Sequence, residues 1–186
     1  MLTYAGHVVW VWCNCHSSDP QVCKELNCVG KDILSLLASS SGAFVFCGSI
    51  AGFVVVDAKS GQNMTVGHVD EGITDVVEVK RERGQGMHRG GDRGAVPADA
   101  SSEIWCIHGN SKLACWDAAT FSSGQCKHVG VGRVSGLVSL PNGQVWSGSS
   151  DGRISVWNAK NKRVIRALGM RHTSAYVIIR QHTYIA

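Results

Sequence analysis

A segment that recurs about every forty residues constrains the fold of this chain more than any other feature. Residues 144–159, QVWSGSSDGRISVWNA, align without gaps with residues 103–118, EIWCIHGNSKLACWDA. An earlier copy at residues 43–61, AFVFCGSIAGFVVVDAKSG, is one residue shorter at its middle turn. Self-similarity at a fixed period is typical of folds in which one supersecondary unit is repeated. We therefore predict a fold assembled from repeated units.

The clearest unit, residues 133–168, has the pattern of four short strands. RVSGLVSL and QVWSGSS are strand-like and flank the turn Pro141-Asn142-Gly143. The tight turn Asp151-Gly152 leads into a third strand, RISVWNA, and KNKRVIRAL supplies a turn and a fourth strand. Four antiparallel strands in about 40 residues make one blade of a β-propeller.

The position of Trp157 in the third strand gives the spacing of the copies. Trp12, Val56 and Trp116 hold the same position elsewhere, so the intervals are 44, 60 and 41 residues. The long interval contains an insertion, residues 80–101, without which it falls to about 40 residues. Three histidines precede first strands at matching positions and are interpreted as fold residues: His68, His128 and His172.

We predict an all-β chain whose 186 residues form a single β-propeller region of about four blade-equivalents. An open portion of a longer propeller is favoured, because rings of this kind usually have about seven blades. The alternative is a closed four-bladed ring, in which the half blades at the two ends complete each other. The predicted divisions are a half blade at 1–30, whole blades at 31–70, 71–130 and 131–171, and a half blade at 172–186.

The unit at residues 133–168 resembles a WD repeat, with a Ser-Gly-Ser-x-Asp-Gly turn and a closing Trp-Asn in place of Trp-Asp. In that family a His before the first strand, a Ser or Thr on the second, the turn Asp and the third-strand Trp form a hydrogen-bonded network. Other copies match less well, because Asn110 stands at the turn Asp and residues 43–61 lack both Trp and turn Asp. The resemblance places the network at His128, Ser149 (or Ser147), Asp151 and Trp157.

Composition and the N-terminal segment bear on the location of the protein. Hydrophobic residues make up 44% of the chain and charged residues 17%, which excludes a disordered tail as a description of the whole. The segment MLTYAGHVVWVWC has no basic region before its short apolar run, so it does not resemble a signal peptide. No stretch approaches the roughly 20 apolar residues that span a bilayer. We therefore expect a cytoplasmic protein with reduced thiols and no membrane span.

Five soft ligands lie close together near the N-terminus: Cys13, Cys15, His16, Cys23 and Cys28. Zinc binds thiolate and imidazole, but this spacing contains no Cys-x2-Cys pair. Alternate cysteines on a strand point to opposite faces. We expect packed or exposed thiols and no metal or cofactor, and a zinc site stays open as the alternative.

The strand pattern and the WD resemblance imply a non-catalytic scaffold for protein–protein interactions and no enzyme activity. Residues 148–152 match the G-x-S-x-G motif of serine hydrolases, but a strand follows them, whereas that motif needs a helix. Partner proteins are expected on the face formed by the loops before each first strand and the turns between second and third strands. The residues predicted near this face are His108, Arg133 and Ser150.

Two alternative functions stay open. In the first alternative, the chain is the regulatory propeller of a larger signalling enzyme, such as a phosphoinositide phosphatase, kinase or exchange factor. The full protein would then have further blades or domains. The second alternative is an RNA-associated scaffold, since the insertion is rich in Arg and Gly. The insertion has no aromatic residue to stack on bases, so nucleic-acid binding is disfavoured and a solvated loop between first and second strands is expected. Its basic residues are Arg81, Arg83, Arg89 and Arg93.

Overall fold

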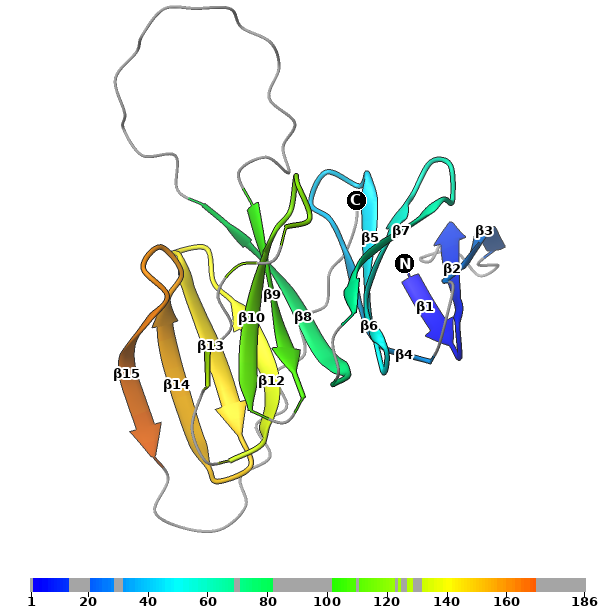
Figure 1. Ribbon diagram of the computed structural model, residues 1–186. Coiled ribbons are helices and arrows are strands. Elements are labelled where there is room, and N and C mark those ends of the chain that lie inside the picture. The colour runs from blue at the N-terminus through cyan, green and yellow to red at the C-terminus, as the bar shows by residue number, and fades with distance from the viewer. Residues whose placement is uncertain are drawn as a thin grey trace, which may run out of the picture.

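The computed structural model describes residues 2–13, 21–28, 32–68, 71–81, 102–109, 111–122, 124, 127–128 and 132–169. These residues form fifteen strands and no helix. The strands pair antiparallel, in chain order, into four sheets that we call A to D. The predicted all-β class is confirmed, and the repeated copies fall in separate sheets (Figure 1).

Three of the sheets have four strands each. Sheet B consists of β4 (Ile33–Ala38), β5 (Phe44–Ser49), β6 (Gly52–Asp57) and β7 (Asn63–His68). Sheet C consists of β8 (Ile73–Lys80), β9 (Ser102–His108), β10 (Lys112–Asp117) and β11 (Lys127–His128). Sheet D consists of β12 (Val134–Ser139), β13 (Gln144–Ser149), β14 (Arg153–Asn158) and β15 (Arg163–Gly169).

Sheet A has three strands, where the sequence predicted a half blade of two. They are β1 (Leu2–Ala5), β2 (Val8–Cys13) and β3 (Gln21–Asn27). The prediction missed β1 because four residues are too few to show an alternating pattern; the chain turns at Gly6, whose φ of 58° suits glycine. At both Trp12 and Trp157 the register with the fourth strand shifts by one residue, so β1, β2 and β3 correspond to second, third and fourth strands. The predicted half blade at 172–186 lies outside the described residues.

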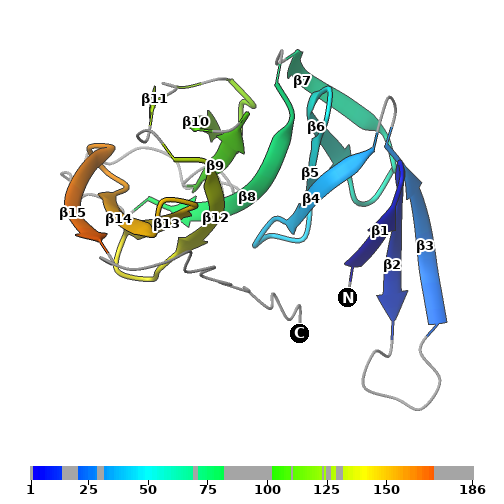
Figure 2. The same ribbon diagram turned by 90° about the horizontal axis from the view of Figure 1, so that it is seen from below.

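The four sheets lie side by side in chain order, and the first strands of sheets B, C and D are adjacent. Figure 2 shows them fanning out from sheet D to sheet A. β4 contacts β8, and β8 contacts β12, whereas β15 is mostly exposed at the outer edge of sheet D. Each first strand also carries a register shift at the same place, between Ile33 and Ser35, Ile73 and Asp75, and Val134 and Gly136.

One backbone hydrogen bond recurs in sheets B, C and D where the second strand turns into the third. The amide of the first turn residue donates to the carbonyl of the residue before the first strand. The three pairs are Ile50 with Asp32 (3.3 Å), Gly109 with Gly72 (3.0 Å) and Ser150 with Arg133 (2.8 Å). These positions are therefore equivalent in the three sheets.

The turns between third and fourth strands are also equivalent. Each begins with the residue that follows the Trp-type position, and the side-chain oxygen of this residue accepts backbone N–H groups two and three residues further on. The acceptors are Asp57, Asp117 and Asn158. Four residues later, the φ angle is positive at Gly61, Phe121 and Lys162 (76°, 53° and 57°). The residues that follow Val56, Trp116 and Trp157 therefore cap the turns between third and fourth strands in sheets B, C and D.

Apolar side chains fill three cores, one between each pair of neighbouring sheets. In β9, Ile104 and Cys106 belong to the core between sheets B and C, whereas Trp105 and Ile107 belong to the core between sheets C and D. A third core joins sheets A and B and includes Cys28 and Cys47. Because sheets B and C are covered on both faces, their strands read as continuous apolar runs.

Aromatic pairs cross two of these boundaries. Trp116 of sheet C stacks on Phe53 of sheet B, with ring centroids 5.5 Å apart. Trp157 of sheet D meets Trp105 of sheet C edge to face at 6.4 Å. The Trp-type position therefore faces the preceding sheet, and Val56 follows the same rule because it lies in the core between sheets A and B.

Candidate interaction surfaces

The residues before the first strands and the turns between second and third strands lie at one end of the sheets. We call this surface the hairpin face, and Figure 2 looks at the molecule from the end that carries it. The opposite surface carries the turns that are capped by Asp57, Asp117 and Asn158, and we call it the Asx face. β8 ends and β9 begins at the Asx face (Figure 1), so the insertion connects a first strand to a second strand, as the sequence predicted.

Three large apolar side chains gather on the hairpin face where sheets A and B meet. Tyr4 is 40% exposed, Leu34 37% and Ile50 48%. The Tyr4 hydroxyl donates to the Leu34 carbonyl at 2.9 Å. A Cβ placed on Gly72 would lie 3.1 Å from Ile50 Cα and 3.3 Å from Leu34 Cδ1, so these two residues border the same glycine. We call Tyr4, Leu34 and Ile50 the apolar patch.

The structure brings two of the three predicted hairpin-face residues together. Arg133 and Ser150 are exposed, and the Arg133 amide donates to Ser150 Oγ at 3.1 Å. The His108 side chain is mostly buried at the end of β9, with Nδ1 3.9 Å from a Glu71 carboxylate oxygen. Glu71 also pairs with Lys112 at 3.3 Å. His108 is therefore mostly buried, whereas Arg133 and Ser150 are exposed on the hairpin face.

The four residues of the predicted WD network do not all meet in the described residues. Trp157 Nε1 donates to Ser147 Oγ at 2.9 Å in the buried core, so Ser147 and not Ser149 is the partner of the tryptophan. The Ser149 hydroxyl instead donates to Asp151 and holds the pKa of that carboxyl below its ordinary range. Asp151 is exposed, so this acceptor lies at the surface and not in the core. The side chain of His128 lies outside the described residues.

Sheet C lacks the polar partner that Ser147 supplies in sheet D. Cys106 occupies the equivalent position, opposite Ala114, as Ser147 lies opposite Ser155. Trp116 Nε1 is buried with no hydrogen-bond partner among the described residues. The tryptophan of sheet C is therefore held by packing against Phe53.

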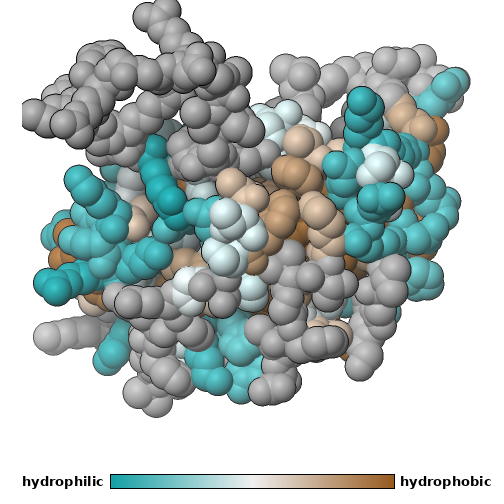
Figure 3. Space-filling model, turned by 45° about the horizontal axis from the view of Figure 1, so that its top comes forward, coloured by the Kyte–Doolittle hydropathy of each residue, from teal (hydrophilic) through white to brown (hydrophobic). Residues whose placement is uncertain are grey.

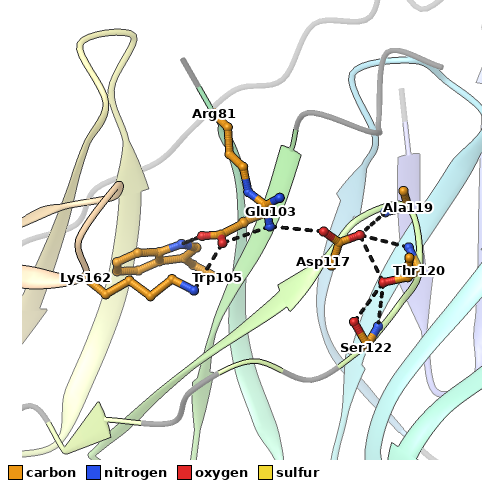
Figure 4. Close-up of polar contacts among 8 residues, drawn as sticks. All are labelled: Arg81, Glu103, Trp105, Asp117, Ala119, Thr120, Ser122 and Lys162. Carbon is orange, nitrogen blue, oxygen red and sulfur yellow. Dashed lines mark hydrogen bonds and ion pairs between the residues drawn. The ribbon is translucent and has the colours of Figure 1, made fainter. Parts of the chain in front are cut away.

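A charged network on the Asx face was not predicted from the sequence (Figure 4). Arg81 Nη2 lies 2.9 Å from a Glu103 carboxylate oxygen and 3.0 Å from Asp117. Lys162, from the turn after β14, approaches Glu103 at 3.1 Å, and Trp105 Nε1 donates to Glu103 at 3.2 Å. Partial burial acts to raise the pKa of Asp117, but the N–H groups of the capped turn outweigh it and lower the pKa. Glu103 therefore links sheet C to sheet D.

One of the four basic residues predicted in the loop, Arg81, belongs to this network. Arg81 is the first residue after β8, and its guanidinium is shared by Glu103 and Asp117. Its ion pairs fix the start of the insertion to sheet C. Arg83, Arg89 and Arg93 lie outside the described residues.

Hydrophobic residues also appear on the Asx side. In Figure 3, which tips this side forward, hydrophilic residues gather at the left and right and hydrophobic residues near the middle. Phe44 and Phe121 are half-buried there against the core between sheets B and C, and their rings meet edge to face at 5.3 Å. They extend this core and complete the packing of Phe46.

The cysteines depart from the predicted pattern of reduced thiols. Cys28, Cys47, Cys106 and Cys115 are free and buried, but Cys23 is disulfide-bonded. The side chains of Cys13, Cys15 and Cys126 lie outside the described residues. Within the described residues no group of three or more His, Cys, Asp or Glu side chains is placed to hold a metal; His16 lies outside them.

A half-buried carboxylate bridges sheets C and D on their first strands. Asp75 accepts the Leu137 amide of β12 at 2.7 Å and its own neighbour Val76 at 2.9 Å. Burial raises the pKa of the Asp75 carboxyl above its ordinary value, against the lowering effect of these two N–H donors. The folded protein therefore holds the Asp75 proton more tightly than the unfolded chain does.

Asp75→Asn is expected to remove a component of stability that falls as pH rises. Because the pKa is raised on folding, the wild-type contribution is fully present below the unfolded pKa and is lost as pH rises through the folded value. The Asn amide has one acceptor oxygen where the carboxylate has two, and this loss lowers the free energy of unfolding of the variant by the same amount at every pH. Urea unfolding from about pH 3.5 to pH 7 should show that the free energy of unfolding of the variant rises relative to that of the wild type as pH increases. A difference that is constant with pH would contradict the role of burial.

The face of sheet D that points away from sheet C carries apolar residues at repeated positions. Val138, Trp146, Ile154 and Val156 pair in the same register as Leu37, Phe46, Phe53 and Val55, which sheet B buries against sheet C. Phe46 is fully buried, whereas Trp146 is half-buried. We call these four residues of sheet D its distal face.

Comparison with models of known protein families gives no match to this chain. No curated protein matches it either. Within the described residues no helix has the length and hydrophobicity needed to cross a membrane.

Proposed function

We propose that this chain is a non-catalytic protein-binding scaffold and that its sheets are WD-type blades of a β-propeller. Three observations support the propeller: neighbouring first strands, one core between each pair of sheets, and hydrogen bonds that repeat at equivalent turns. The spacing of Trp12, Trp116 and Trp157, and the capped turns that follow two of them, support the WD-type assignment.

The apolar patch is the observation that carries the binding function. Tyr4, Leu34 and Ile50 are exposed on a face whose backbone is fixed by repeated hydrogen bonds. Large apolar side chains that need no ordering before they bind contribute most of the affinity at protein interfaces. Polar and charged groups, including Arg133 and Ser150, lie on the same hairpin face and suit the rim of such an interface.

Ile50→Glu is expected to lower the affinity for proteins captured by the wild-type chain by roughly tenfold or more, since it places a charge in the contact. Ile165→Glu is the matched control, because Ile165 is 55% exposed but lies on the outer strand β15. Quantitative capture from cell extract should show proteins retained by wild type and by Ile165→Glu that Ile50→Glu releases. Equal retention by the two variants would refute binding at the apolar patch.

A second candidate, the propeller portion of a larger signalling protein, is favoured by the distal face of sheet D. Val138, Trp146 and Ile154 occupy positions that bury apolar side chains in sheets B and C. A further blade packed on sheet D would cover them in the same way. A cytoplasmic location is part of the first proposal, and cell fractionation tests it.

A further inference from the structure

Two buried thiols meet across the boundary between sheets A and B. Cys28 follows β3 in sheet A, and Cys47 lies on β5 in sheet B. Their Sγ atoms are 3.3 Å apart, and the residues are 2% and 0% exposed. The proposed binding function does not involve this pair of cysteines.

We propose that Cys28 and Cys47 form a reversible disulfide that joins sheet A to sheet B when the protein meets hydrogen peroxide. The sulfurs need to approach by little more than about 1 Å to reach the bonding distance of about 2.05 Å. Both side chains already belong to one core, so the bond requires local repacking and no rearrangement of the sheets.

The two thiols have unequal roles in the reaction. Their mutual hydrogen bond lowers the pKa of Cys28, whereas the same bond and burial raise the pKa of Cys47. Cys28 is therefore the thiol that gives up its proton more readily, and its sulfur attacks one peroxide oxygen. The O–O bond breaks, and the hydroxide that leaves takes up the proton from Cys28, so one water is released as Cys28 becomes a sulfenic acid. Cys47 then attacks the Cys28 sulfur, and the sulfenic hydroxyl leaves with the Cys47 proton as a second water. Two thiols lose two electrons in total, and one peroxide is reduced to two waters.

The disulfide would fix the boundary on which the apolar patch lies. Tyr4 belongs to sheet A, whereas Leu34 and Ile50 belong to sheet B and the turn after β5. Any effect of oxidation on partner binding rests on the proposed function. The formation of the cross-link does not depend on the proposed function, so each of the two proposals can be refuted without the other.

Peptide mapping tests the cross-link directly. The full chain is reduced with dithiothreitol, freed of reductant, treated with hydrogen peroxide, alkylated and digested with trypsin. Cleavage after Lys24, Lys31 and Lys59 places Cys28 in peptide 25–31 and Cys47 in peptide 32–59, each as the single cysteine. We expect the two peptides joined, with a mass about 2 Da below their sum, and separated again by dithiothreitol. Cys106 and Cys115 should stay alkylated as internal controls.

Variants and unfolding distinguish this disulfide from general oxidation. In Cys47→Ser, or Cys47→Ala if the serine variant does not fold, the link is lost and Cys28 stops at a sulfenic acid that dimedone traps. Oxidised wild type should unfold at a higher urea concentration than reduced wild type, and the variant should show no such shift. Peptides 25–31 and 32–59 that both remain alkylated after peroxide, or Cys28 joined to another cysteine, would overturn the proposal.

Discussion

Replacing Trp105 by alanine is expected to lower the free energy of unfolding by about 3–5 kcal/mol. Trp105 is 1% exposed, lies in the core between sheets C and D, and meets Trp157 edge to face. Its removal opens a cavity that two stiff sheets cannot close, and it strands the Glu103 oxygen that accepts its indole N–H. Because a domain of this size is stable by about 5–15 kcal/mol, the loss is a large share of the total.

Trp146→Ala is the matched control for this experiment. Trp146 occupies the equivalent position in β13, and its indole N–H donates to Gln144 at 3.2 Å as that of Trp105 donates to Glu103. The two tryptophans differ in burial, since Trp146 is half-buried on the distal face of sheet D. We therefore expect Trp146→Ala to cost about 1–2 kcal/mol.

Urea unfolding of the two variants also tests the support for a larger propeller. A small loss at Trp146 means that the distal face is open in this chain and free to take a further blade or a partner. Equal losses at Trp105 and Trp146 would mean that the distal face is already covered, and would remove the support for a larger propeller.

The sequence predicted the strands of sheets C and D well because two independent signals agree in both of these repeats. The third strand and its turn are marked by the Trp-type residue and by the Asp or Asn that caps the turn, and both are local effects. The missed strand β1 has neither signal. Its pairing with β2 depends on the turn at Gly6 and on packing with sheet B, which a four-residue pattern cannot show.

The candidate surfaces were harder to predict, because they depend on contacts between sheets. Glu103 reads as an isolated charge in a strand, yet it meets residues 22 positions before it and 59 after it, Arg81 and Lys162. Leu34 near the start of β4 and Ile50 in the turn after β5 are large and apolar, yet both are exposed on the hairpin face. Periodicity identifies which face of its own sheet a side chain takes, and it does not reveal what the neighbouring sheet offers.

Glu103→Ala is expected to lower the free energy of unfolding by about 2–4 kcal/mol. The change leaves the buried Trp105 N–H without an acceptor and releases Arg81 and Lys162 from their shared partner. Part of the ionic contribution is discounted, because Arg81 and Lys162 are partly exposed and screened by solvent. Urea unfolding at low and high salt measures the total and its ionic part.

Glu103→Gln separates the hydrogen bond from the charge, and the protein already has a Gln at the equivalent position of sheet D. Gln144 holds the equivalent position in sheet D and accepts the Trp146 indole N–H. The Gln variant should therefore keep the indole bond, lose about 1–2 kcal/mol, and approach the wild type as salt rises, because salt screens ion pairs and leaves a neutral hydrogen bond nearly unchanged. If Gln costs as much as Ala at every salt concentration, the amide does not replace the carboxylate for Trp105, and the link between sheets C and D depends on the charge of Glu103 and not on the shape of its side chain.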